Sequence, residues 1–118
     1  MNFWCLTTVF TQENEAGVND LNSGSKWSIH IDTLTGAEDL LFNSKVILKD
    51  MFSVAYVNGR LTPNQYPSHT VSRELIRDEF GSGVRVFVTH RKEDSPTMVQ
   101  VFTLYDLLDY CFVELRMQ

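Results

Sequence analysis

Positive charge is scarce in this chain. Its 118 residues contain 10 Lys and Arg against 15 Asp and Glu, which gives a formal net charge of −5. The first 25 residues contain no Lys or Arg at all. Proteins that bind nucleic acid by neutralising phosphates and releasing counterions need a surplus of these residues. The composition therefore argues against a nucleic-acid partner, and we expect another protein instead.

Cysteine and long hydrophobic runs are also scarce. Cys5 and Cys111 lie in the apolar contexts F-W-C-L and Y-C-F-V, where thiols behave as small hydrophobes, although pairing between them stays open. No run approaches the roughly 18 apolar residues of a membrane span. The apolar N-terminal stretch lacks a basic region and a cleavage site. We therefore expect a cytoplasmic protein with no membrane association, folded as a single compact domain over residues 1–118.

Signatures of catalysis and metal binding are missing as well. The sequence has no Cys-x-x-Cys, no His-x-x-x-His, no phosphate-binding glycine loop and no G-x-S-x-G elbow. Each of these motifs brings together the groups that its chemistry needs. We therefore expect no enzymatic activity, no cofactor and no metal.

Several segments have the period-two alternation or the turn residues of strands. Phe3–Thr11 is rich in aromatic and β-branched residues, and Lys26–Asp32 alternates apolar and polar side chains. The loop-forming residues of 12–25 would connect them. Residues 84–103 predict a hairpin, and Asn58-Gly59 predicts a second, tight one because both residues tolerate positive φ.

Three other segments favour helices. Residues 36–52 carry apolar side chains at helical spacing after a Thr35–Glu38 capping box, although Asn43-Ser44 could interrupt the helix and a strand could begin at Val46. Residues 71–80 and 104–110 have the same kind of pattern, and 111–117 is either a last strand or a continuation of the final helix.

These elements predict an α+β fold. We expect an antiparallel or mixed sheet of about five to six strands, built from hairpins, with two to three helices packed on one face.

The loops supply the candidate contact residues for a protein partner. Acidic, cationic and tyrosine side chains at loops and strand ends can act as interface anchors or orient a partner. The predicted partner-binding residues are Glu13, Glu15, Asp20, Arg60, Tyr66, Arg91 and Lys92.

An alternative site uses the segment 66–77. If a helix began near Ser68, its free amides could hold an anion. His69, Arg73 and Arg77 would then bind a phosphorylated ligand or nucleotide, with Tyr66 stacked on its base.

Three functional hypotheses follow. The first is a small acidic protein that acts by protein–protein interaction, as an inhibitor, immunity-type or adaptor protein of the kind encoded by phages and mobile elements. The alternative is a protein that binds or cleaves a small phosphorylated ligand. The third is a homo-oligomeric structural subunit in which an edge strand, such as 111–117, pairs with another copy.

Overall fold

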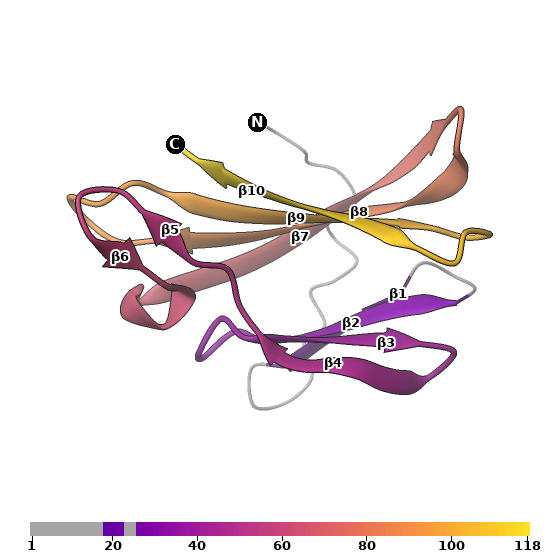
Figure 1. Cartoon of the computed structure of the whole chain (residues 1–118), viewed down its shortest axis with the longest axis horizontal. Helices are drawn as coiled ribbons and strands as arrows, with labels where there is room; N and C mark the ends of the chain where they lie inside the picture. The colour runs from indigo at the N-terminus through magenta and orange to yellow at the C-terminus, as the bar shows by residue number, and fades with distance from the viewer. Residues whose placement is uncertain (1–17, 23–25) are drawn as a thin grey trace.

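The computed structural model describes residues 18–22 and 26–118, and within them it is built almost entirely from strands. Two four-stranded antiparallel sheets lie face to face (Figure 1). The first sheet contains β1 (Val18–Asn22), β2 (Trp27–Asp32), β3 (Glu38–Phe42) and β4 (Lys45–Met51), paired in that order. The second contains β7 (Ser68–Asp78), β8 (Gly81–Arg91), β9 (Met98–Tyr105) and β10 (Cys111–Met117), also paired in chain order.

The main core fills the space between the two sheets. Alternation along β2 turns Trp27, Ile29 and Ile31 inward, and alternation along β8 and β9 does the same for the second sheet. The cluster comprises Trp27, Ile29, Ile31, Leu40, Val84, Val86, Val88, Phe102 and Leu104. The opposite face of β8 and β9 carries a further buried cluster of Phe87, Val99 and Val101. β9 is consequently buried at all of its positions.

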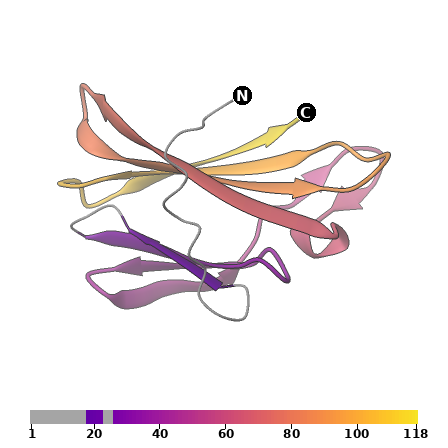
Figure 2. The ribbon, with the colours of Figure 1, turned by 180° about the vertical axis from the view of Figure 1, so that it is seen from behind.

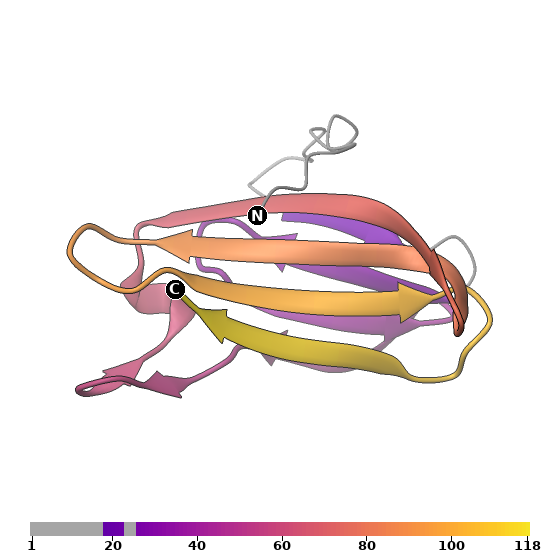
Figure 3. The ribbon, with the colours of Figure 1, turned by 90° about the horizontal axis from the view of Figure 1, so that it is seen from above.

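Each sheet ends in two edge strands. Figure 3 looks down onto the second sheet, with β7 and β10 at its margins. β4 and β10 lie along one side of the sandwich, and β1 and β7 lie along the other, as the opposite views in Figures 1 and 2 agree. Edge strands have one unpaired row of backbone hydrogen-bonding groups.

A small hairpin and a short helical turn close one end of the molecule. β5 (Ala55–Tyr56) pairs with β6 (Arg60–Leu61), and a single 3-10 turn, Pro63–Gln65, leads into β7. Asn58 and Gly59 both have positive φ between the two short strands, as a tight hairpin turn requires. The 56–62 hairpin expected from Asn-Gly is therefore confirmed, although its loop has three residues, 57–59, instead of two.

The expected α+β class is wrong, because the described residues contain no α-helix. Residues 36–52 form the hairpin of β3 and β4 instead of a helix. Asn43 and Ser44 adopt φ of 53° and 67°, which makes the tight turn that the sequence left open as an interruption. The turn brings Leu40 and Leu48 opposite each other, so a hairpin also satisfies the apolar spacing that suggested a helix.

Residues 71–78 are likewise in a strand and 79–80 are in the turn that follows it, so the predicted helix there is wrong. β7 pairs along its full length with β8, from Ser68 opposite Arg91 to Asp78 opposite Gly81. Val71 and Leu75 share the inward face of β7 with Arg73, because these residues stand opposite the inward-facing Val88, Val84 and Val86. The arginine at the rim of the sandwich removes the alternation that identifies a strand.

Of the remaining predictions, some are wrong and others are confirmed. The third helix, over 104–110, is wrong, since β9 continues to Tyr105 and a loop follows. Part of the expected 12–25 loop, Val18–Asn22, is strand β1. The alternation in β2, the 84–103 hairpin and the last strand, β10, are confirmed. The strand expected at Phe3–Thr11 lies outside the described residues.

Candidate functional site

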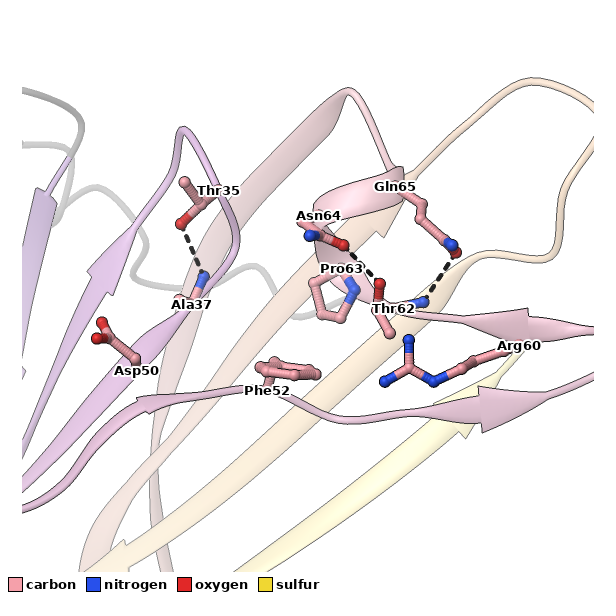
Figure 4. Close-up of a pocket in the computed structure, with 9 residues that line it drawn as sticks. All are labelled: Thr35, Ala37, Asp50, Phe52, Arg60, Thr62, Pro63, Asn64 and Gln65. Atoms are coloured by element: carbon pink, nitrogen blue, oxygen red, sulfur yellow. Dashed lines mark hydrogen bonds between the residues drawn. The ribbon is translucent and has the colours of Figure 1, made fainter.

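A pocket opens where the end of β4 meets the β5–β6 hairpin and the 3-10 turn (Figure 4). Its volume is about 540 Å³, within the usual range for ligand sites. The lining residues are Thr35, Ala37, Asp50, Phe52, Arg60, Thr62, Pro63, Asn64 and Gln65. Thr35 and Ala37 belong to the β2–β3 turn, so the pocket joins three separate stretches of the chain, 35–37, 50–52 and 60–65.

Hydrogen bonds hold the wall made by residues 62–66 in place. The side-chain oxygen of Gln65 accepts from the Thr62 amide at 3.0 Å, and the Thr62 hydroxyl donates to the Asn64 side chain. The amides of Gln65 and Tyr66 donate to the Thr62 and Pro63 carbonyls, each at 3.0 Å. The turn is therefore ordered by its own sequence, T-P-N-Q-Y.

Two charged groups at the pocket have no protein partner among the described residues. The Arg60 guanidinium makes no ion pair or hydrogen bond there, and the same holds for the Asp50 carboxylate, although the Asp50 amide donates to Asp39. Phe52 lies between these two residues and below Pro63 (Figure 4), with half of its surface exposed. The pocket thus offers an apolar floor with a free cation and a free anion on either side.

A chain of buried and half-buried polar side chains lies next to the pocket. The His69 and His90 Nδ1 atoms are 2.8 Å apart, and His90 Nε2 is 2.7 Å from the Gln100 Oε1. The Gln100 Nε2 donates to the Ser53 hydroxyl at 2.9 Å and to the Glu38 carboxyl at 3.3 Å. Glu38 and Ser53 directly follow the pocket residues Ala37 and Phe52 in the chain.

The orientation of the Gln100 amide assigns the proton positions in this chain. With the amide nitrogen directed at Ser53 and Glu38, the Gln100 oxygen accepts from His90 Nε2–H. The neutral His90 ring then carries a lone pair on Nδ1, and the proton between the two rings belongs to His69. Only one proton fits between two nitrogens at this distance.

Burial shifts the pKa of each titratable member of the chain. Desolvation raises the pKa of Glu38 from 4.5 to about 8, and the hydrogen bond from Gln100 offsets part of that rise. One Glu38 oxygen, Oε2, has no hydrogen-bond partner. Desolvation also lowers the pKa of both histidines; Asp32 and the Tyr66 backbone oppose this at His69, Gln100 opposes it at His90, and His69 lowers it further there.

The edge strand β4 runs away from the pocket and is apolar along its exposed middle. Val46, Ile47 and Leu48 are 48%, 49% and 51% exposed. Every residue from Lys45 to Asp50 is exposed. By contrast, β3 lies between β2 and β4, and all of its residues are buried or half-buried. Within residues 18–22 and 26–118, no strand pairs with the outer side of β4. An exposed apolar run on such an edge is unusual, because it attracts other strands.

The residues predicted to bind a partner are dispersed over the molecule. Arg60 lines the pocket, whereas Tyr66 is buried and donates its hydroxyl hydrogen to the Pro96 carbonyl at 2.8 Å. Arg91 and Lys92 are exposed at the end of β8. Asp20 lies on β1 opposite His30, and Glu13 and Glu15 lie outside the described residues.

The residues of the alternative phosphate site are not brought together. His69, Arg73 and Arg77 lie along one strand instead of at a helix start, so the helical amides that the site required are absent. At about 3.3 Å per residue, Arg73 is roughly 13 Å and Arg77 roughly 26 Å from His69 along β7. Tyr66 packs near His90, with ring centroids 6.2 Å apart.

Sequence reasoning missed Phe52, Asp50, Glu38 and Gln100. Asp50 and Phe52 were placed in a helix, while Glu38 was assigned to a capping box. Gln100 carries no sequence signal, because its role depends on contacts with residues 47 and 62 positions away in the chain. The stretch N-G-R-L-T did predict a hairpin, and Arg60 and Thr62 from it line the pocket.

Among residues 18–22 and 26–118, no group of three or more His, Cys, Asp or Glu side chains is arranged to hold a metal ion. No helix in that part of the chain has the length and apolarity to cross a membrane. Comparison of the chain with protein-family models, curated proteins and solved structures finds no match.

Proposed function

We propose that this protein binds another protein by holding an extended segment of it along β4. The observation that carries the proposal is the outer edge of β4, with which no described strand pairs, and its three consecutive half-exposed apolar residues, Val46–Leu48. A strand that joins a sheet edge gains main-chain hydrogen bonds, and its alternate side chains settle on the exposed apolar ones.

The pocket extends this surface beyond the end of β4. Phe52 follows the strand directly, and Arg60 has no partner within the described structure. The segment that fits carries apolar side chains in alternation over β4 and ends in a carboxylate within reach of Arg60. Charge-assisted hydrogen bonds from a guanidinium to a carboxylate are among the stronger polar contacts.

Features of the edge restrict which strands can pair with it. Lys45 and Lys49 flank the apolar run, and the register with β3 shifts between Leu40 and Leu41, opposite Ile47. Lysines and bulges at sheet edges oppose indiscriminate pairing. These features support a selective partner over general aggregation, as an inhibitor, immunity-type or adaptor protein requires.

Selection from a displayed library of random peptides tests the proposal. We expect the protein to select extended apolar sequences with an acidic residue near one end, and Ile47→Lys to weaken the binding of the selected peptides by about tenfold or more. Leu107→Lys is the matched control, because Leu107 is an exposed apolar residue in the β9–β10 loop. Equal binding by the Ile47→Lys variant and the native protein would rule out the β4 edge as the site.

Self-association is a second candidate, and a separate patch favours it. Phe80, Tyr105, Tyr110 and Phe112 pack ring against ring with centroids 5.6–6.1 Å apart. Three of them, Phe80, Tyr110 and Phe112, are about half exposed, and Phe112 lies on the edge strand β10. The two candidate functions differ in which strand becomes covered. Binding of another protein covers β4 with a foreign segment, whereas self-association covers β10 with a second copy of the chain.

A further inference from the structure

His69 and His90 contact each other beside two of the pocket walls. The two residues are direct cross-strand partners on β7 and β8, and their rings meet edge to face with centroids 5.0 Å apart. His90 is fully buried. Burial and the fixed register leave the rings little freedom to separate while both strands stay in place.

Packing connects this pair to two of the pocket walls. Gly36 lies so close that a methyl group on its Cα would be 2.8 Å from His69 Nδ1 and 2.9 Å from the Pro63 side chain. Gly36 lies between the pocket residues Thr35 and Ala37, and Pro63 lines the pocket itself. The His69 ring therefore borders Gly36 in the β2–β3 turn, and the Pro63 side chain of the 3-10 turn borders the same glycine.

We propose that the His69–His90 pair is a pH-sensitive latch for the pocket, closed while the two rings share one proton and opened when both become imidazolium ions. With the His90 Nε2–H committed to Gln100, a first added proton leaves His69 donating to His90 and preserves the contact. A second must go to His90 Nδ1, which places two N–H groups head to head at 2.8 Å. The rings must then separate, since like charges directly opposite in a sheet repel.

The groups that face His69 and His90 from neighbouring elements decide whether acid or base opens the latch. Asp32 at the end of β2 and the Tyr66 backbone favour a charge on His69, which makes His69 the first to protonate. His90 faces Gln100 on β9, with Glu38 on β3 beyond it. The raised pKa of Glu38 keeps its carboxyl group protonated below pH 8, so it supplies no counter-charge to a second imidazolium ion. Acid therefore opens the latch.

If the pocket is part of the binding surface, acid should release a bound segment; this consequence rests on the proposed function. The latch itself does not rest on that function, and it is tested on the protein alone. Amide hydrogen exchange of Gln65 and Tyr66, whose hydrogen bonds hold the 3-10 turn, is measured between pH 7 and pH 5. Rates are corrected for intrinsic exchange and compared with amides paired between β8 and β9.

We expect these two amides to lose about tenfold in protection in acid relative to the β8–β9 amides. Opening takes up one proton, and each unit of pH then changes the equilibrium constant for opening by about tenfold. In His69→Asn, a neutral side chain can still donate to His90, and the protection should become independent of pH. His30→Asn, on the outward face of β2, should behave like the native protein. Equal protection at both pH values, or an unchanged pH dependence in His69→Asn, would overturn the proposal.

Titration of the imidazole nitrogens of the native protein by NMR keeps the test decisive if His69→Asn does not fold. The expected result is two separate protonation steps, with the shifts of Gly36 and its neighbours changing only at the second step. A single independent titration for each ring, without any response from Gly36, would contradict the latch. Neither result involves a partner, so failure of the latch leaves the β4 proposal intact.

Discussion

Glu38 lies between the two sheets with only 1% of its surface exposed. Its carboxyl group gains one hydrogen bond, from Gln100, and its other oxygen has none. A buried carboxylate with so few donors is costly, whereas the neutral acid is tolerated. Glu38 is consequently protonated in the folded protein at neutral pH and ionised in the unfolded chain.

This difference predicts how stability depends on pH. Between pH 4.5 and about 8 the folded protein holds a proton that the unfolded chain has lost, so stability falls as pH rises, by at most about 1.4 kcal/mol per pH unit. Glu38→Gln resembles the neutral acid and removes this loss. We expect the variant to be similar to the native protein near pH 4.5 and more stable at pH 8.

Urea denaturation across that pH range measures the effect. Glu93→Gln is a matched control, because Glu93 is exposed in the β8–β9 turn and its removal should leave the slope unchanged. Parallel stability profiles for native protein and Glu38→Gln would show that Glu38 is ionised in the fold, contrary to the account. The histidine pair acts in the opposite direction, because its lowered pKa values reduce stability as pH falls below about 6.5.

At the scale of elements, the turn between β3 and β4 decides whether residues 36–52 form a helix or a hairpin. Asn43 and Ser44 both have positive φ, a region that glycine enters without steric cost. We expect Ser44→Gly to stabilise the protein by about 0.5–1 kcal/mol. Ser28→Gly, inside β2, should destabilise it instead, because glycine weakens strand interiors.

Thermal or urea denaturation of the two glycine variants distinguishes the structures. If residues 36–52 were helical, glycine at position 44 would cost about 1 kcal/mol. A clear loss of stability in Ser44→Gly would therefore contradict the hairpin. The variant is also a useful background for β4 substitutions, since it fixes the strand without altering its exposed side chains.

The sequence predicts strands where one face is buried and the other is not. β2 alternates throughout and was predicted, and the long β8–β9 hairpin was recognised from its turn. β7 was not, because Arg73 interrupts the inward face at the rim and R-E-L-I-R-D-E-F favours a helix when isolated. Pairing with β8 along the whole strand overrides that local preference.

The candidate site was predictable only in part. Arg60 was expected to contact a partner, and the turn chemistry of Asn58-Gly59 placed it beside a hairpin turn. The pocket also needs Thr35, Asp50 and Phe52, which reach it through the hairpin that was mistaken for a helix. The buried chain from His69 to Glu38 depends on the packing of one sheet on the other, and local sequence patterns do not encode it.

At the scale of the whole molecule, the two sheets leave four edges, of which β4 and β10 lie on the same side. Apolar side chains are exposed on both strands, including Leu48 and Val113. Sheet edges that remain exposed in a single chain are places where another strand can be added. The sandwich therefore places two candidate contact strands, β4 and β10, along the same side.

The most direct test of the central claim is amide hydrogen exchange along β4, measured with and without a peptide selected by the protein. The account predicts that amides of residues 45–51 gain protection on binding, that those of β10 do not, and that Ile47→Lys abolishes the gain. Protection confined to β10, appearing as the protein is concentrated without peptide, would contradict it and favour self-association. Protection of neither strand would remove both sheet edges as binding surfaces.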